Sequence, residues 1–141
     1  MPLEWSNMIT ASELQEKLST ISIGSNTCNF SLETCERFVP LINKINQIKQ
    51  EKNAIILAHS YVTPEILHGV ADHVGDSFEL AKAAQNTDCD TIIFAAVKFM
   101  AETAKILNPN KKVYIPSEIN GCSLADSITA KEVLELKKQY P

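Results

Sequence analysis

The chain has 141 residues, of which 45% are hydrophobic and 21% are charged, a composition typical of about one soluble globular domain. Its 13 Lys and Arg and 17 Asp and Glu give a net charge of −4 without any basic run, which excludes a nucleic-acid surface of clustered cations. No apolar run approaches the roughly 18 residues of a membrane span, and the first residues lack the basic-then-apolar order of a signal peptide. We therefore expect a cytoplasmic protein that binds neither nucleic acid nor membrane.

The first third of the chain contains two expected helices and a loop. A capping-box pattern that starts at Thr10 predicts a short helix over residues 11–19. Residues 21–30 carry turn-forming side chains without a hydrophobic period, which favours a loop. A second helix is expected from near Pro40 to near Lys52, because a proline in a helix interior removes a backbone hydrogen bond.

From residue 54 onward, apolar runs alternate with helix-start signals. Continuous apolar runs are typical of strands that are covered on both faces in a parallel sheet. The order strand, helix, helix, strand, helix, strand, helix predicts a three-layer α/β/α domain with a parallel sheet. The expected strands cover residues 54–58, 91–95 and 112–115, and the expected helices begin near residues 64, 77, 99 and 130, the first of them running to about His73.

Ligands of such sheets bind at the carboxyl ends of the strands, where loops meet helix N-termini. This rule selects one segment after each expected strand. Phosphate-binding glycine motifs and zinc-binding histidine motifs are absent from the sequence, so neither a plain nucleotide-binding domain nor a zinc site is expected. The three selected segments are residues 58–61, 95–98 and 116–122.

His59 and Tyr61 follow the first expected strand, where an imidazole and a phenol can face a ligand. Such side chains bind a carboxylate or move a proton. A histidine at a strand end can equally serve only to bond a carbonyl group. The position of His59 alone supports these two interpretations equally.

Ser77 and Cys122 are the other candidates at this edge. Ser77 stands at a helix start, where its hydroxyl and free N–H groups can hold an anion such as a carboxylate; an ordinary helix cap is the stronger competing interpretation. Cys122 lies at or near a helix start in the third segment. A helix N-terminus favours the thiolate, which binds iron or attacks carbon, and an inert thiol is an equal alternative.

Three further cysteines lie outside the selected segments. Cys28 and Cys35 are seven residues apart, a spacing that matches neither a CxxC motif nor a ferredoxin motif. We expect both to be packing or surface thiols. We expect Cys89, which precedes the second strand, to be structural.

Four blocks of sequence stand in a specific order and spacing. They are EKNAIILAH (51–59) with Tyr61 and Pro64-Glu65-Ile66, AD with VGDS (71–77), FMAETAKILNP (99–109) and GCSLAD (121–126). Each block alone is a modest signal. Together they resemble the quinolinate synthase family, over about residues 42–141.

This resemblance implies a fold, a reaction and a set of site residues. The family has three similar α/β/α domains around a pseudo-threefold axis and condenses iminosuccinate with dihydroxyacetone phosphate to quinolinate in de novo NAD biosynthesis, with L-aspartate oxidase as the supplier of iminosuccinate. By the resemblance, Cys122 is one of three cysteine ligands of a 4Fe-4S cluster whose open iron acts as a Lewis acid. His59 and Tyr61 match catalytic positions, with Tyr61 assisting dehydration and proton transfer, and His59 and Ser77 match positions that bind iminosuccinate.

Length separates this chain from the family pattern, because family chains run to roughly twice its length or more. We expect residues 1–40 to be an N-terminal extension with a short helix, outside the resemblance. Residues 41–141 would be the first domain of a quinolinate synthase, truncated before the second domain, and inactive without the domains that bring the other cluster ligands. Two other interpretations stay open: a non-catalytic remnant or interaction domain that keeps the fold without the cluster, and, more weakly, a thiol redox protein that uses Cys28 and Cys35.

Overall fold

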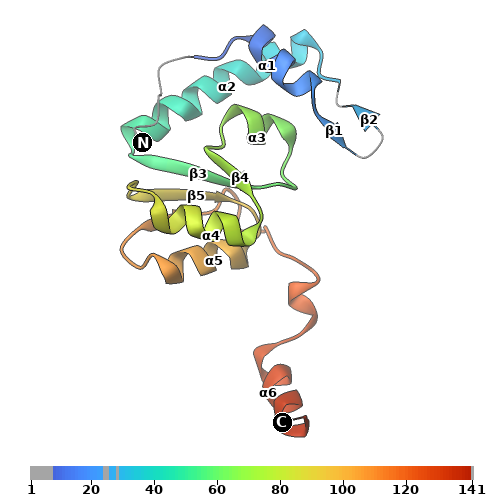
Figure 1. Cartoon of the computed structure of the whole chain (residues 1–141), viewed down its shortest axis with the longest axis vertical. Helices are drawn as coiled ribbons and strands as arrows, with labels where there is room; N and C mark the ends of the chain where they lie inside the picture. Colours follow the sequence, from blue (N-terminus) through green and yellow to red (C-terminus); the bar gives the residue numbers. More distant parts are fainter. Residues whose placement is uncertain (1–7, 24–25, 28, 141) are drawn as a thin grey trace.

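A computed structural model describes residues 8–23, 26–27 and 29–140. Figure 1 shows a central sheet with helices on both faces and a C-terminal helix that points away from the sheet. The elements are α1 (Ala11–Ser19), β1 (Ser22–Ile23), β2 (Asn26–Thr27), α2 (Leu32–Glu51), β3 (Ala54–His59), α3 (Pro64–Gly69), β4 (His73–Gly75), α4 (Ser77–Asn86), β5 (Thr91–Ala95), α5 (Lys98–Leu107), β6 (Lys112–Tyr114), the 3-10 turn η1 (Ala125–Ser127) and α6 (Ala130–Gln139).

The central sheet has four parallel strands in the order β4-β3-β5-β6. The apolar run of β3 is buried from Ala54 to Ala58, as expected for an inner strand that is covered on both faces. All the strands of this sheet run in one direction, so their carboxyl ends meet at one edge. The predicted α/β domain with a parallel sheet and helices on both faces is therefore confirmed.

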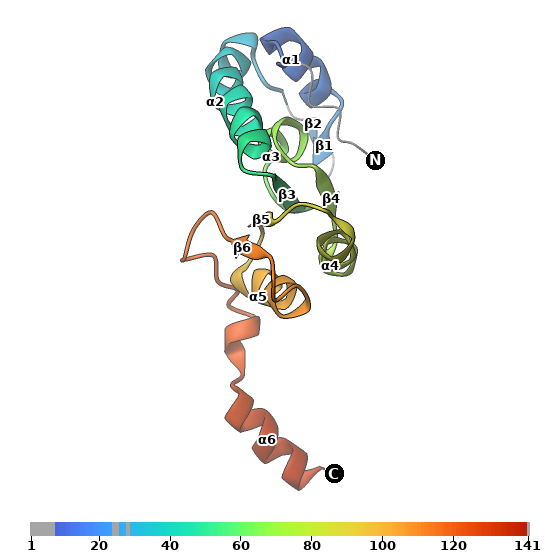
Figure 2. The ribbon, with the colours of Figure 1, turned by 90° about the vertical axis from the view of Figure 1, so that its left-hand side faces the viewer.

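Each face of the sheet has its own apolar core. On one face, Leu80 of α4 and Ala104 of α5 pack with Leu57 and Phe94 of the sheet. On the other face, Leu14 of α1 and other side chains of α1 and α2 pack with the sheet, and Figure 2 shows α1, α2 and α3 above the strands and α4 and α5 below them. Helices α1 and α2 thus belong to the same packed unit as the sheet, and the boundary expected after residue 40 falls inside α2.

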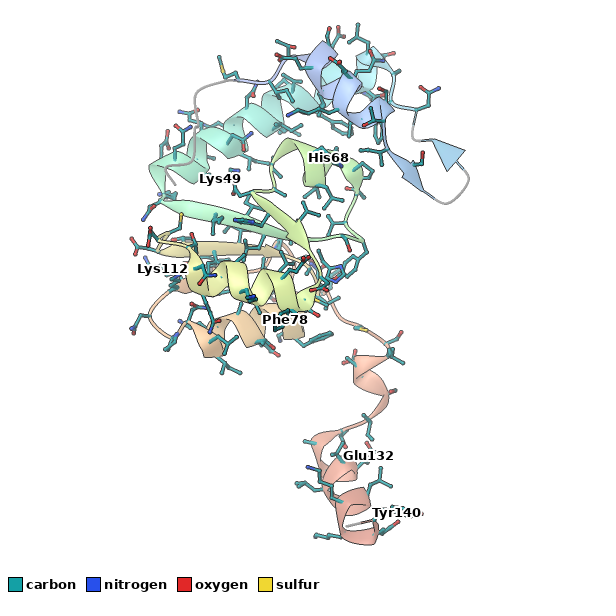
Figure 3. All side chains as sticks on the ribbon, viewed as in Figure 1. Lys49, His68, Phe78, Lys112, Glu132 and Tyr140 are labelled. Atoms are coloured by element: carbon teal, nitrogen blue, oxygen red, sulfur yellow. The ribbon has the colours of Figure 1, made fainter. Side chains whose placement is uncertain are left out.

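The C-terminal segment lies apart from this packed unit. Every described residue from Ser123 to Tyr140 is exposed. Helix α6 begins at the start predicted near residue 130, with a capping box at Thr129, and leaves Leu134 and Leu136 open to solvent. Figure 3 shows its Glu132 and Tyr140 far from the side chains of the sheet.

The start of α2 was predicted wrongly. The helix begins at Leu32, after the N-cap Ser31, and Pro40 lies inside it. A proline in a helix interior costs about 3 kcal/mol. Burial of Cys35, at 0% exposure, and of Ile42, at 5%, in the core that α2 shares with α1 offsets this cost.

Three short strands, β1, β2 and β4, were also missed. Residues 21–30 were expected to be a loop, but β1 and β2 form an antiparallel pair with Ser22 opposite Thr27. The helix expected to reach His73 ends at Gly69, and residues 73–75 form the edge strand β4. Three residues are too few for a sequence period to appear, and β4 exists because it pairs with β3.

A buried ion pair joins α2 to the sheet. Lys49 Nζ lies 2.8 Å from Asp72 Oδ1, and the two side chains are only 5% and 7% exposed. Lys49 Nζ also donates to the carbonyl oxygen of Val70 at 2.6 Å, and Asp72 Oδ2 accepts the N–H of Ile56 at 2.7 Å. The pair is thus satisfied on several sides, which a buried charge requires.

Substitution of Lys49 tests this ion pair. Lys49→Met keeps much of the side chain but leaves the Asp72 carboxylate buried without its cation, which costs about 3–5 kcal/mol. We expect the free energy of unfolding in urea to fall by that amount. The matched control is Lys98→Met: Lys98 and Glu102 are 61% and 59% exposed and 4.0 Å apart, so its loss is about 0.5 kcal/mol or less. Equal losses in the two variants would contradict the assigned role.

Burial also makes stability depend on pH through Cys35. Desolvation raises the pKa of this thiol above its usual value. The folded-state pKa therefore exceeds the unfolded value of about 8.5, so the contribution to stability is complete below pH ~8.5 and is lost as the pH rises through the folded pKa. Between pH 7 and pH 10 we expect the free energy of unfolding to fall more in the unsubstituted chain than in Cys35→Ala. The same fall in both chains would show that Cys35 is not responsible.

Candidate functional site

The three segments that the sequence selected meet at the carboxyl edge of the sheet. Tyr61, after β3, accepts a hydrogen bond from the main chain of Val97, after β5. The main chain of Lys98 in turn donates to Asn120, after β6, at 2.8 Å. The start of α4 joins the same edge, because the register sets Gly75 of β4 beside His59.

His59 and Tyr61 form a stacked pair of rings at the end of β3. Their ring centroids are 4.1 Å apart and the ring planes are inclined by 27°. His59 Nδ1 accepts a long hydrogen bond of 3.4 Å from the main-chain N–H of Tyr61. In a neutral imidazole one nitrogen accepts and the other donates, so this contact is compatible with the tautomer that carries its proton on Nε2.

The hydroxyl group of Tyr61 connects two loops. Tyr61 Oη accepts the N–H of Val97 at 2.9 Å, although the ring itself is 56% exposed. Because the oxygen acts as acceptor in this contact, the hydroxyl proton remains available to donate. Tyr61 is thus held in place by a bond that leaves its donor function open.

Ser77 is the first residue of α4, and the N-terminus of that helix is already capped. Asp76 Oδ1 accepts the N–H groups of Phe78 and Glu79, each at 2.9 Å, and Glu79 completes the capping box. The ordinary helix cap, the stronger of the two interpretations, is therefore what the structure shows, and the Asp76 carboxylate occupies these two N–H groups. The side chain and the main-chain N–H of Ser77 are not used by this cap and remain as candidate contacts for a ligand.

Cys122 lies after β6, in the third of the selected segments. Its side chain is partly exposed, and its carbonyl oxygen accepts the N–H of Asp126 at 2.9 Å. The element that follows is the three-residue 3-10 turn η1 and not an α-helix. Cys122 is a partly exposed thiol, a soft ligand of the kind that binds iron, and the helix start expected at or near it is only this 3-10 turn.

The remaining cysteines do not join this edge. Cys35 and Cys89 are buried in the two apolar cores, as predicted. A raised pKa keeps the Cys35 thiol protonated, which disfavours thiol redox chemistry at that residue. Cys28 lies outside the described residues, and its predicted role is untested.

No group of three or more His, Cys, Asp or Glu side chains able to hold a metal occurs among the described residues. A cluster bound at Cys122 therefore needs additional ligands from outside the described part of this chain. None of the helices that the structure describes is long and apolar enough to cross a membrane.

A separate hollow lies on the opposite side of the sheet from α4 and α5. It is an apolar groove of about 720 Å³, lined by Ile45 and Ile48 of α2, Ile93 of β5 and Tyr114 of β6, among others. The candidate side chains His59, Tyr61, Ser77 and Cys122 do not line it. Its size is therefore no guide to the site.

Sequence reasoning missed the part that Asn120 plays. Its carbonyl oxygen accepts the N–H of Lys98, and its amide Nδ2 donates to the carbonyl oxygen of Ala96 at 3.4 Å. One signal could have found it: the N-cap position of α5 is Val97, a residue that cannot cap a helix with its side chain. The first N–H groups of α5 therefore need acceptors other than a capping side chain, and Tyr61 and Asn120 supply them for Val97 and Lys98.

A family model described as quinolinate synthetase A protein matches residues 43–141. The chain belongs to the quinolinate synthase family. The match contains the whole parallel sheet and all four candidate residues.

Curated quinolinate synthases are similar to this chain over about 70% of its length. The protein of Caulobacter vibrioides is 57% identical over 102 residues, which are 72% of this chain and 28% of that protein. The protein of Thermococcus kodakarensis is 54% identical over 101 residues, which are 72% of this chain and 33% of that protein. The chain thus spans about a third or less of the length of these quinolinate synthases.

The capping of α4 beside Ser77 can be tested by substitution. Asp76→Ala removes the acceptor of two main-chain N–H groups, and we expect it to lower the free energy of unfolding by about 1 kcal/mol in urea. Thr63→Ala is the matched control, because Thr63 is the N-cap of α3 but makes no side-chain capping bond. We expect little change in that variant, and a loss as large as that of Asp76→Ala would show that the carboxylate bonds are not the cause.

Proposed function

We propose that this chain supplies the first-domain part of a quinolinate synthase, which condenses iminosuccinate with dihydroxyacetone phosphate and releases two waters and phosphate. The observation that carries the proposal is the match over residues 43–141, because it includes every residue expected to act. The convergence of the loops after β3, β5 and β6 supports it. A parallel sheet binds ligands at this edge.

His59 and Tyr61 suit the handling of a dicarboxylate that must lose water. His59 presents an Nε2–H donor, since its Nδ1 accepts from Tyr61, and this donor would bind a carboxylate of iminosuccinate. The hydroxyl group of Tyr61 keeps its proton free to donate while Val97 holds the oxygen in place. It would give that proton to a departing hydroxyl group during dehydration.

Ser77 would contribute a hydroxyl donor to the same substrate. The carboxylate of its neighbour Asp76 caps α4 and, being negatively charged, repels the carboxylate of an approaching substrate. The side chain of Ser77 would therefore have to reach the iminosuccinate carboxylate by itself. This makes Ser77 an orienting contact that is weaker than His59.

Cys122 would hold one iron of a 4Fe-4S cluster. The thiol fits this role because it is soft, partly exposed and at the carboxyl edge, but one thiol cannot hold a cluster alone. When bound, the cluster supplies a Lewis-acidic iron for the substrate. The other ligands would come from the part of the enzyme that this chain does not span, so we expect the chain alone to be inactive, and L-aspartate oxidase is the expected supplier of iminosuccinate.

A chimera tests the proposal. Residues 43–141 of this chain replace the matching part of the Caulobacter vibrioides quinolinate synthase, to which they are closely similar. We expect the chimera, purified without oxygen, to contain iron and to form quinolinate from iminosuccinate and dihydroxyacetone phosphate, as followed by chromatography. Cys122→Ser should abolish iron incorporation, and Cys89→Ser, at a buried core thiol, should not.

The controls separate this proposal from its alternative. A folded chimera with neither iron nor product would favour a non-catalytic remnant that keeps the fold. Equal iron contents in the Cys122→Ser and Cys89→Ser variants would overturn the assignment of Cys122.

A further inference from the structure

Helix α5 begins without a cap of its own. The first N–H groups of an α-helix have no partner within the helix and are usually satisfied by the side chain at the N-cap. The N-cap of α5 is Val97, which makes no side-chain capping bond. Two other loops supply the acceptors: Tyr61 Oη for the N–H of Val97, at 2.9 Å, and the carbonyl oxygen of Asn120 for the N–H of Lys98, at 2.8 Å.

Asn120 contacts this helix start at two points. Its carbonyl oxygen accepts from Lys98, and its side-chain Nδ2 donates to the carbonyl oxygen of Ala96 at 3.4 Å. The two contacts lie on either side of Val97 in the sequence. The second contact needs a side-chain donor, which Asn provides and Ala does not.

Apolar packing contributes little to holding the loop that contains Asn120. Ile119, directly before it, is 91% exposed, and Leu124 is 80% exposed. Within the loop, Gly121 N–H donates to the carbonyl oxygen of Ile119, a local bond that does not attach the loop to the sheet. The polar contacts of Asn120 with Ala96 and Lys98 therefore attach the loop to the start of α5, two residues before Cys122.

We propose that Asn120 is a positioning residue, whose side-chain amide holds Cys122 at the α5 N-terminus beside the loop of Tyr61. The inference rests on the proposed function for what Cys122 binds, but the holding itself is a property of this chain. Asn120 acts through Ala96 and Lys98 and does not touch the substrate. Loss of its amide leaves one main-chain bond, so the loop opens more often and the Cys122 thiol becomes accessible more often.

Alkylation of the whole chain by iodoacetamide, quantified at each cysteine by peptide mass spectrometry, tests the proposal. In Asn120→Ala we expect Cys122 to react faster by up to about fivefold, the factor by which loss of one hydrogen bond shifts a local opening equilibrium, because the thiol is only partly exposed while the loop is closed. Cys35 and Cys89, which are buried, should keep their rates and thereby report that the fold is intact. Asn120→Gln restores a side-chain donor and should recover part of the protection.

A matched control and a second readout separate positioning from general loosening. Ile119→Ala removes an exposed side chain from the same loop and should leave the Cys122 rate unchanged. Amide exchange followed by NMR should be faster at Lys98 in Asn120→Ala and at Val97 in Tyr61→Phe. These readouts need neither iron nor substrate, so the positioning role can stand or fall separately from the proposed function.

An unchanged Cys122 rate in Asn120→Ala would overturn the proposal. Faster reaction at Cys35 and Cys89 as well would also overturn it, because the effect would then be loss of the fold. Equal acceleration by Ile119→Ala would show that any change in the loop has this effect.

Discussion

One buried ion pair connects the elements on which the candidate site depends. Lys49 comes from α2, and Asp72 from the connection between α3 and β4. Asp72 also exchanges hydrogen bonds with the main chain of Ile56 in β3, through its carboxylate and its own N–H. Asp72 thereby fixes the edge strand in the register that sets Gly75 beside His59. A buried carboxylate needs its cation. The pair therefore holds α2, β3 and the edge of the sheet with the candidate site together as one unit.

The carboxyl edge itself is held by polar contacts to the start of α5. Tyr61 and Val97 are 36 residues apart in sequence, yet the hydroxyl of one accepts the N–H of the other. The N–H groups at the start of α5 need acceptors, and the loops that provide them are thereby joined to one another. In these contacts His59 Nδ1 and Tyr61 Oη act as acceptors, and the Cys122 thiol stays partly exposed at the same edge.

Local sequence signals predict the helix starts of this protein well where the contacts that form them are themselves local. The capping boxes at Thr10, Asp76 and Thr129 all form, because their partners lie three residues away. The failures occur where distant contacts decide. Pro40 is tolerated inside α2 because Cys35 and Ile42 on neighbouring turns are buried in the core shared with α1. Strand β4 exists only because β3 is its partner.

The sequence by itself determined the buried strands, most of the helix starts, the parallel α/β order, the family and the four candidate residues. Each of these depends on spacing, periodicity or ordered motifs that are present along the chain. Only the tertiary structure decided that Asp76 occupies the anion-binding groups beside Ser77, that Tyr61 and Asn120 both satisfy the start of α5, and that α6 extends into solvent. These outcomes depend on hydrogen bonds and packing between residues far apart in sequence, and no local pattern contains the free energy of such contacts.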